Sequence, residues 1–265
     1  MIEKTKTNQM QRYLRTSATI AVAGILAFGS IDKGYSNSNA NGTGSQTQTT
    51  QSQPVKKVPE WVGKGEALLG AGRYNDALEV FNNAVEKDPK DVDAWILKGS
   101  TLGLLGRNEE ALDAFGKATE ADPKNALAWI AKGGMLSEFG RYDEALIAFG
   151  KGTEADPKMA AGWTGKGFAL LKLDNIEDAL GAFNVVLLKI DPNDPDALMG
   201  KGFALGKLGR SDAALDAFDN AIKADPKTAG AWLGKGAILM DLGRESEGIK
   251  CLEQYKKLSE LQSGH

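Results

Sequence analysis

The chain has 265 residues with a formal net charge of −3, and 42% of its residues are hydrophobic and 25% charged, which excludes a collagen-like or wholly disordered chain. Its one histidine, His265, is the last residue, and Cys251 is its one cysteine. An intrachain disulfide, a Cys/His zinc site and Ser-His-Asp or Cys-His catalysis in the folded body are therefore excluded. We predict that the protein is not an enzyme and uses no cofactor and no metal.

The charge is unevenly distributed along the chain. Residues 1–58 hold 7 of the 32 basic and 2 of the 35 acidic residues, so residues 59–265 hold 25 basic and 33 acidic residues and a net charge of −8. A protein that binds a phosphate backbone needs a basic face. The acidic body therefore argues against a nucleic-acid partner.

The N-terminal segment 1–30 has the parts of a secretory signal. Four basic side chains precede an apolar run from Ala18 to Phe28, and the small residues Gly29 and Ser30 follow it. The run is shorter than the roughly 20 apolar residues of a membrane span. We predict export to the periplasm or the extracellular space, with this segment either removed or kept as an uncleaved membrane anchor.

A tether follows the signal over residues 31–57 and is rich in Ser, Asn, Gln and Thr. Its central stretch, 36–53, has no charged residue and no apolar residue larger than alanine. Such a stretch buries too little surface to offset the entropy lost on ordering. We predict that the tether is disordered.

From residue 58 the chain repeats one unit six times. Tryptophan marks the period of 34 residues, and Leu198 takes its place in the fifth unit; the tryptophans are Trp61, Trp95, Trp129, Trp163 and Trp232. Glycine follows each mark by four residues and, except in the last unit, phenylalanine follows it by twenty. The predicted repeats are 58–91, 92–125, 126–159, 160–194, 195–228 and 229–262, with a tail at 263–265. The fourth unit has one extra residue before its Asp-Pro pair.

This pattern resembles the tetratricopeptide repeat (TPR), a helix–turn–helix unit of 34 residues. The resemblance implies an all-α fold, a right-handed α-solenoid of helix pairs. Within each unit the glycine is expected to let the two helices approach, and the phenylalanine to fill the space beside that contact. A Gly-Arg pair ends the first helix in five units, where glycine accepts the left-handed conformation, and Asp174-Asn175 replaces it in unit four.

The resemblance also implies that the first helices line a concave groove that binds peptides. In this chain the expected lining is apolar, with charged residues further along the helices. The candidate residues are Ile96, Leu104, Ile130, Glu138, Phe168, Leu171, Lys172, Met199, Phe203, Lys207 and Leu233. The alternative is that Phe168, Met199 and Phe203 only pack between repeats.

A lysine follows each tryptophan, or Leu198, by three residues. These lysines are Lys64, Lys98, Lys132, Lys166, Lys201 and Lys235. Such a row is able to bind an anionic polymer, but the acidic body favours lysines that pack along the seam between repeats and pair with nearby carboxylates.

The sequence therefore indicates an exported TPR scaffold that binds a protein or peptide segment, in the assembly of a cell-envelope complex. The alternative is a scaffold that assembles with itself through the ends of its solenoid. No small-molecule substrate is expected, and contact with a membrane is expected only if the N-terminal segment is not cleaved.

Overall fold

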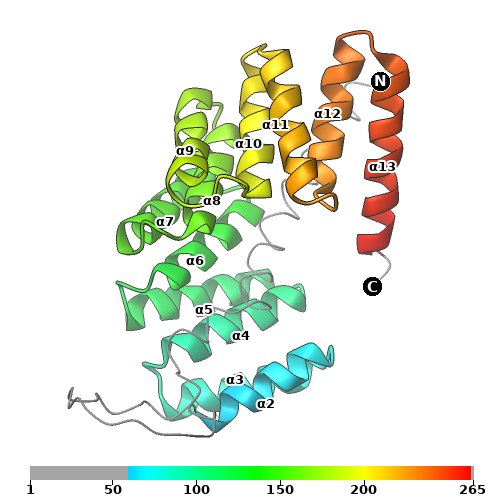
Figure 1. The fold of residues 1–265 in the computed structure, drawn as a ribbon. Coiled ribbons are helices and arrows are strands. Elements are labelled where there is room, and N and C mark those ends of the chain that lie inside the picture. Colours follow the sequence, from blue (N-terminus) through cyan, green and yellow to red (C-terminus); the bar gives the residue numbers. More distant parts are fainter. Residues whose placement is uncertain (1–58, 264–265) are drawn as a thin grey trace, which may run out of the picture. The chain divides into compact units, whose positions relative to one another are not determined.

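The computed structural model describes residues 59–263, and this part of the chain contains twelve helices and no strand (Figure 1). The predicted signal and almost all of the predicted tail lie outside the described residues, as does the whole tether. The first helices of the six pairs are α2 (Glu60–Gly70), α4 (Val92–Leu104), α6 (Ala126–Glu138), α8 (Ala160–Lys172), α10 (Pro195–Lys207) and α12 (Ala229–Asp241). The second helices are α3 (Tyr74–Lys87), α5 (Asn108–Ala121), α7 (Tyr142–Ala155), α9 (Ile176–Lys189), α11 (Ser211–Ala224) and α13 (Glu245–Ser263).

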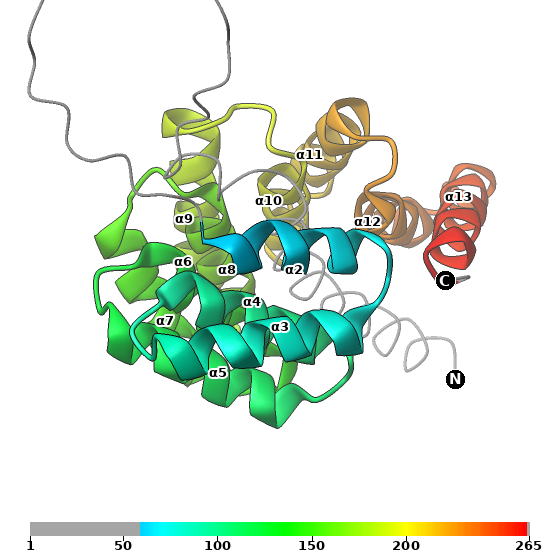
Figure 2. The same cartoon turned by 90° about the horizontal axis from the view of Figure 1, so that it is seen from below.

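The helix pairs form two compact units. One holds α2 to α5 and the other begins at Pro123 and holds α6 to α13. In the first unit, α2 and α3 run antiparallel and are joined by a short turn (Figure 2). The prediction of an all-α fold built from helix pairs is confirmed. No helix between residues 59 and 263 combines the length and the apolar character that a bilayer crossing requires.

The turn inside each pair is set by one residue in the left-handed conformation. Five of the six are glycines with φ between 70° and 74°, and the sixth is Asp174 with φ 60°. In unit four the amide of Asn175 donates to the carbonyl of Leu170 (2.9 Å), as the arginine amide does in the other turns. Aspartate tolerates this conformation better than most residues, so the turn keeps its geometry without glycine.

The extra residue of unit four lies in the turn after α9. Helices α7, α9 and α11 each have 14 residues. Five residues separate α9 from α10, against four between α7 and α8 and four between α11 and α12. The amides of Ile190 and Asp191 both donate to the carbonyl of Val186 at 2.9 Å. The insertion therefore lengthens the connection rather than the helix.

In four of the repeats, tryptophan is hydrogen-bonded to the proline carbonyl six residues before it. The indole Nε1 of Trp163 donates to the carbonyl of Pro157 at 3.0 Å, and Trp95, Trp129 and Trp232 make the same bond to the Asp-Pro pair that precedes them. Leu198 has no such donor, so the seam between units four and five lacks this hydrogen bond.

In the third, fourth and fifth repeats the core is a phenylalanine held between two glycines. Phe183 of α9 is fully buried. A Cβ added to Gly167 of α8 would lie 2.5 Å from its ring, and a Cβ added to Gly200 of α10 would lie closer still. Phe149 is held in the same way by Gly133 and Gly165, and Phe218 by Gly202 and Gly234. The glycine in the same repeat matches the prediction, whereas the second glycine, from the next repeat, was not anticipated.

This packing predicts opposite effects for two glycine-to-alanine changes. A Cβ at Gly133 would lie 2.9 Å from the ring of Phe149, whose other side is closed by Gly165, so Gly133→Ala should lower the free energy of unfolding by about 1–3 kcal/mol. Gly150, inside α7, has no atom within 4 Å of its added Cβ. Gly150→Ala should raise that free energy by about 0.5–1 kcal/mol, because alanine favours the helix. Urea unfolding of both variants checks this, and equal effects would contradict the packing.

Successive first helices lie side by side in the unit that begins at Pro123. Helix α8 contacts α6 and α10 directly, and α10 contacts α12, while successive second helices share far less contact. Helix pairs that touch along one side and separate along the other form a curved stack. The first helices therefore line its inner side, and hollows open between the second helices on its outer side.

Candidate functional site

Five of the predicted groove residues belong to the core. They are Ile96, Ile130, Leu171, Met199 and Leu233, and none exposes more than 6% of its surface. Ile130 shows the reason, because it fills the space above Gly152 of α7 and Gly162 of α8. The prediction that these side chains line a groove is wrong, since a partner on the surface cannot contact them.

Phe168 and Phe203 occupy the same position of α8 and α10 and are half-buried. The ring of Phe168 meets that of Phe183 edge to face, with centroids 5.2 Å apart, and Phe203 meets Phe218 in the same way at 5.1 Å. Phe203 also lies against α12 of the next repeat, because a Cβ added to Gly234 would be 3.0 Å from its ring, so packing between repeats accounts for part of its burial. Both residues still leave part of their surface exposed. Their binding role stays a prediction, as does that of Leu104 in the first unit, which is 42% exposed.

The charged candidates differ in how they are held. Lys207 forms an ion pair with Asp174 of the preceding repeat, with Nζ and Oδ1 2.7 Å apart. Its charge is therefore already partly neutralised. Lys172 and Glu138 are half-buried near the ends of α8 and α6.

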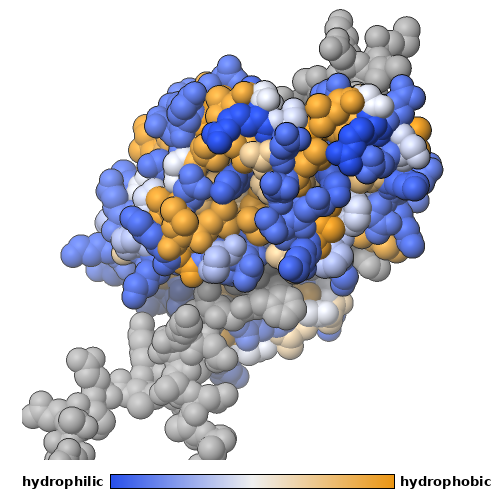
Figure 3. Space-filling model, turned by 45° about the horizontal axis from the view of Figure 1, so that its top comes forward, coloured by the Kyte–Doolittle hydropathy of each residue, from blue (hydrophilic) through white to orange (hydrophobic). Residues whose placement is uncertain are grey.

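An exposed apolar row at the ends of the first helices was not predicted. In the unit that begins at Pro123, each first helix is followed directly by a large apolar residue that is 36–46% exposed; these are Phe139, Leu173, Leu208 and Leu242. The signal was present in the sequence, because each lies ten residues after the tryptophan or Leu198. Figure 3 shows apolar patches set among polar residues on one face of the molecule.

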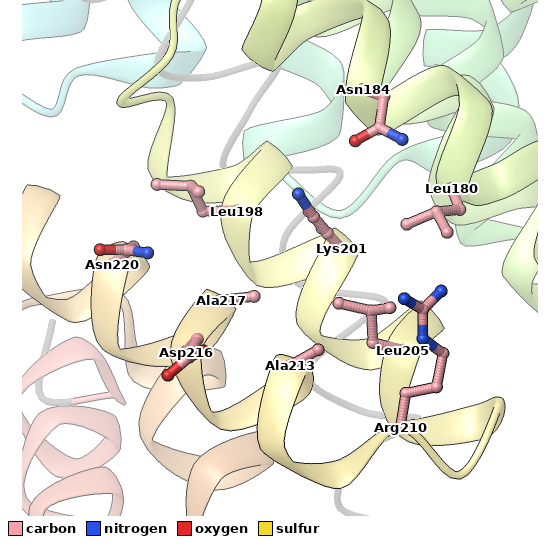
Figure 4. A pocket seen from close by; sticks show the side chains of 10 residues that line it. All are labelled: Leu180, Asn184, Leu198, Lys201, Leu205, Arg210, Ala213, Asp216, Ala217 and Asn220. Atoms are coloured by element: carbon pink, nitrogen blue, oxygen red, sulfur yellow. The ribbon is translucent and has the colours of Figure 1, made fainter.

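Two hollows open between successive second helices. One lies over α10 between α9 and α11 and has a volume of about 370 Å³ (Figure 4). The other lies over α8 between α7 and α9 and has a volume of about 520 Å³. Each has a lysine of the predicted row in its lining, Lys201 in the first and Lys166 in the second. Lys166 and Lys201 therefore lie on the outer side of this stack and not on the side lined by the first helices.

Most lysines of the row have a partner at the seam, as the sequence indicated, although the partner is usually an aromatic ring. Lys98, Lys132 and Lys166 lie 4.9–5.4 Å from the centroid of the tryptophan three residues before them. Lys235 forms an ion pair with Asp219 of α11. These contacts hold the lysine stems against the helices and neutralise part of their charge.

The described residues offer binding surfaces rather than reactive groups. Cys251 is buried, and burial raises the pKa of its thiol, so the nucleophilic thiolate is disfavoured. No group of three or more His, Cys, Asp or Glu side chains in residues 59–263 is arranged to hold a metal ion. At the start of α7, a hydrogen bond from Arg141 lowers the pKa of Glu144, as expected for a solvated ion pair.

A known protein family matches the repeats of this chain. The sequence profile of the tetratricopeptide repeat matches residues 62–126, 105–160, 136–195 and 200–260. No curated protein matches the chain by sequence.

Several solved structures are similar to the chain. YrrB, described as a TPR protein with an unusual peptide-binding site, is 25% identical, with a TM-score of 0.51 over 68% of this chain and 93% of YrrB. The type IV pilus biogenesis factor PilW is 19% identical, with a TM-score of 0.65 over 74% of this chain and 91% of PilW. A tetratricopeptide repeat protein from Parabacteroides merdae is 19% identical, with a TM-score of 0.62 over 75% of this chain and 78% of that protein. At 19% identity the last two show the fold alone.

Proposed function

Because the chain belongs to the tetratricopeptide repeat family, we propose that it is an exported, non-catalytic scaffold that binds a segment of another protein during assembly of a cell-envelope complex. The observation that carries this proposal is the surface formed by successive first helices, on which Phe168 and Phe203 remain partly exposed at equivalent positions. An exposed aromatic pair of this kind is a typical anchor for a partner.

A peptide is the favoured class of ligand. YrrB, the similar structure at 25% identity, is described as having a peptide-binding site. A surface built from parallel rows of side chains suits an extended segment or a helix better than a compact small molecule. The accessible part of the predicted groove combines two aromatic rings with two lysines, Lys172 and Lys207, which favours an amphipathic segment that carries acidic residues.

Recovery of the partner tests the proposal. The full-length protein is purified under mild conditions from the envelope fraction of its native host, and the proteins that accompany it are identified by mass spectrometry. We expect one defined protein in a fixed ratio to the chain. Recovery of further copies of the chain alone would favour the alternative of a self-assembling scaffold, and recovery of neither would contradict both.

Export is tested at the N-terminus. The basic segment followed by a short apolar run is the observation behind it, and it lies outside the described residues. N-terminal sequencing of the protein from its native host should give a first residue between Ser30 and Asn37. An intact Met1 on soluble cytoplasmic protein would contradict export.

A further inference from the structure

The arginines before the second helices and the lysines on the first helices have interaction partners that recur from repeat to repeat. An arginine precedes the second helix in five of the six repeats, and in four of these it forms an ion pair with the carboxylate three residues on, at 2.5–2.7 Å; these are Arg73, Arg107, Arg141 and Arg244. In three repeats the lysine on the first helix, Lys98, Lys132 or Lys166, lies over its tryptophan, and Lys235 pairs with Asp219 of the preceding second helix.

The fifth repeat departs from this pattern at two positions, and each departure removes the partner of a cation. Leu198 replaces the tryptophan on which Lys201 would lie, and Ala213 stands where the partner of Arg210 would be. Asn184 of the fourth repeat stands at the position that Asp219 occupies for Lys235, so Lys201 has no carboxylate there either. Within residues 59–263, neither Lys201 nor Arg210 has a carboxylate at ion-pair distance or an aromatic ring beneath it.

The same three positions line one hollow. Leu198, Asn184 and Ala213 all border the space of about 370 Å³ between α9 and α11, together with both cations. In Figure 4 the ammonium of Lys201 is directed toward Asn184, and the side chain of Arg210 extends past Leu205 toward Leu180. The carboxylate of Asp216 points away from Lys201. The two cations are therefore directed toward the side of the hollow formed by α9.

We propose that this hollow binds a carboxylate of a protein segment, with an apolar side chain of that segment resting on the half-buried Leu180 and Ala213. Its lining carries two positive charges and one negative charge, a net charge of +1 that matches a carboxylate better than a phosphate dianion. Asn184 and Asn220 offer amide donors to the oxygens that the cations leave free.

The neighbouring hollow over α8 provides a matched comparison. There Lys166 lies 5.3 Å from the centroid of Trp163, and Asn175 donates to Asp178 at 2.7 Å. Both polar groups at this hollow are therefore engaged, although its volume, about 520 Å³, is larger. The smaller hollow over α10 therefore has two cations without a partner in the described part of the chain, whereas the one cation of the larger hollow over α8 lies over a tryptophan ring.

Short peptides test the binding of a carboxylate to the full-length chain. The probes are N-acetyl-Ala-Leu with a free C-terminus, the same peptide as its C-terminal amide, N-acetyl-Leu-Glu amide and inorganic phosphate, and the readout is the NMR shift of the side-chain amides of Asn184 and Asn220. At least one carboxylate probe should bind about tenfold or more tightly than the Ala-Leu amide, because a hydrogen bond to a charged group contributes that much. Comparing the two carboxylate probes distinguishes a C-terminus from an acidic side chain. Equal binding of the amide, or tighter binding of phosphate, would overturn the proposal.

Substitutions that restore the repeat pattern locate the site. Ala213→Glu returns a carboxylate to Arg210, and Leu198→Trp returns a ring to Lys201. Each of these variants should bind the carboxylate probe about tenfold more weakly than the wild type, as should Lys201→Ala. Lys166→Ala, in the neighbouring hollow, should leave binding unchanged. Circular dichroism confirms that each variant is folded, and Ala213→Glu, at the surface, keeps the test valid if Leu198→Trp does not fold. Wild-type affinity in both Ala213→Glu and Lys201→Ala would contradict the site.

This site is separate from the surface in the proposed function. It is formed by α9, α10 and α11 on the outer side of the stack, whereas Phe168 and Phe203 lie on the first helices. If Ala213→Glu abolishes binding of the carboxylate probe while the envelope partner is still recovered, the two sites act independently. Failure of the probe to bind leaves the proposed function unaffected.

Discussion

Phe183→Ala is expected to destabilise the protein by about 3–5 kcal/mol, the usual cost of removing a fully buried phenylalanine. The ring has no exposed surface and lies between Gly167 and Gly200. Glycines on both sides have no side chain that could move into the vacated space, so the cavity should stay largely open. Denaturant unfolding measures the change.

The control and the spread of the damage make this prediction specific. Ile147→Ala, at a residue that is 62% exposed on α7, should change the free energy of unfolding by no more than about 0.5 kcal/mol. Because each repeat contacts only its neighbours, hydrogen exchange should accelerate first in α8 to α11. A loss below about 1 kcal/mol in Phe183→Ala would show that the phenylalanine does not hold the repeats together.

The double variant Phe168→Ala with Phe203→Ala is expected to lose capture of the partner protein. Interface anchors typically contribute about 2 kcal/mol or more, which corresponds to roughly a 30-fold weaker complex. Both rings also pack on buried phenylalanines, so the double variant should lose some stability as well. Recovery of the envelope partner, measured at a temperature where the helical signal of the variant is intact, separates the two effects.

Two further variants complete this test. Ile147→Ala with Ile249→Ala removes exposed apolar surface from the second helices α7 and α13 and should leave capture unchanged. Lys172→Glu should weaken capture more at low salt than at high salt, because exposed charges are screened. If the folded double variant Phe168→Ala with Phe203→Ala still captured the partner, the aromatic pair would not be part of the binding surface.

Much of the fold follows from the residues that recur. The glycine four residues after each tryptophan predicts a close approach of two helices, and Phe183 against Gly167 confirms it. The turn at Asp174 was also predictable, because few residues other than glycine accept a left-handed conformation. A second glycine row, which includes Gly165 and Gly200, was visible in the sequence, but its contact depends on how the next repeat stacks.

The binding surface was harder to predict for the same reason. A helical position identifies a face, but the tilt between repeats decides whether that face is covered. Ile130 and Met199 lie on faces that the adjacent helices bury, although the family pattern places this row in the groove. Asn184 and the departures at Leu198 and Ala213 are separated in sequence, and the three-dimensional arrangement of α9 to α11 brings them to one hollow.

Site-specific photo-crosslinking in the native host tests the central claim, that the first helices hold a partner protein, most directly. A photoreactive amino acid is placed at Lys172 on α8 or, as the comparison, at Lys189, which is exposed on the second helix α9. The account predicts a crosslink from position 172 to the protein that accompanies the chain, and none to that protein from position 189. Crosslinks from position 189 alone, or only between copies of the chain, would contradict it.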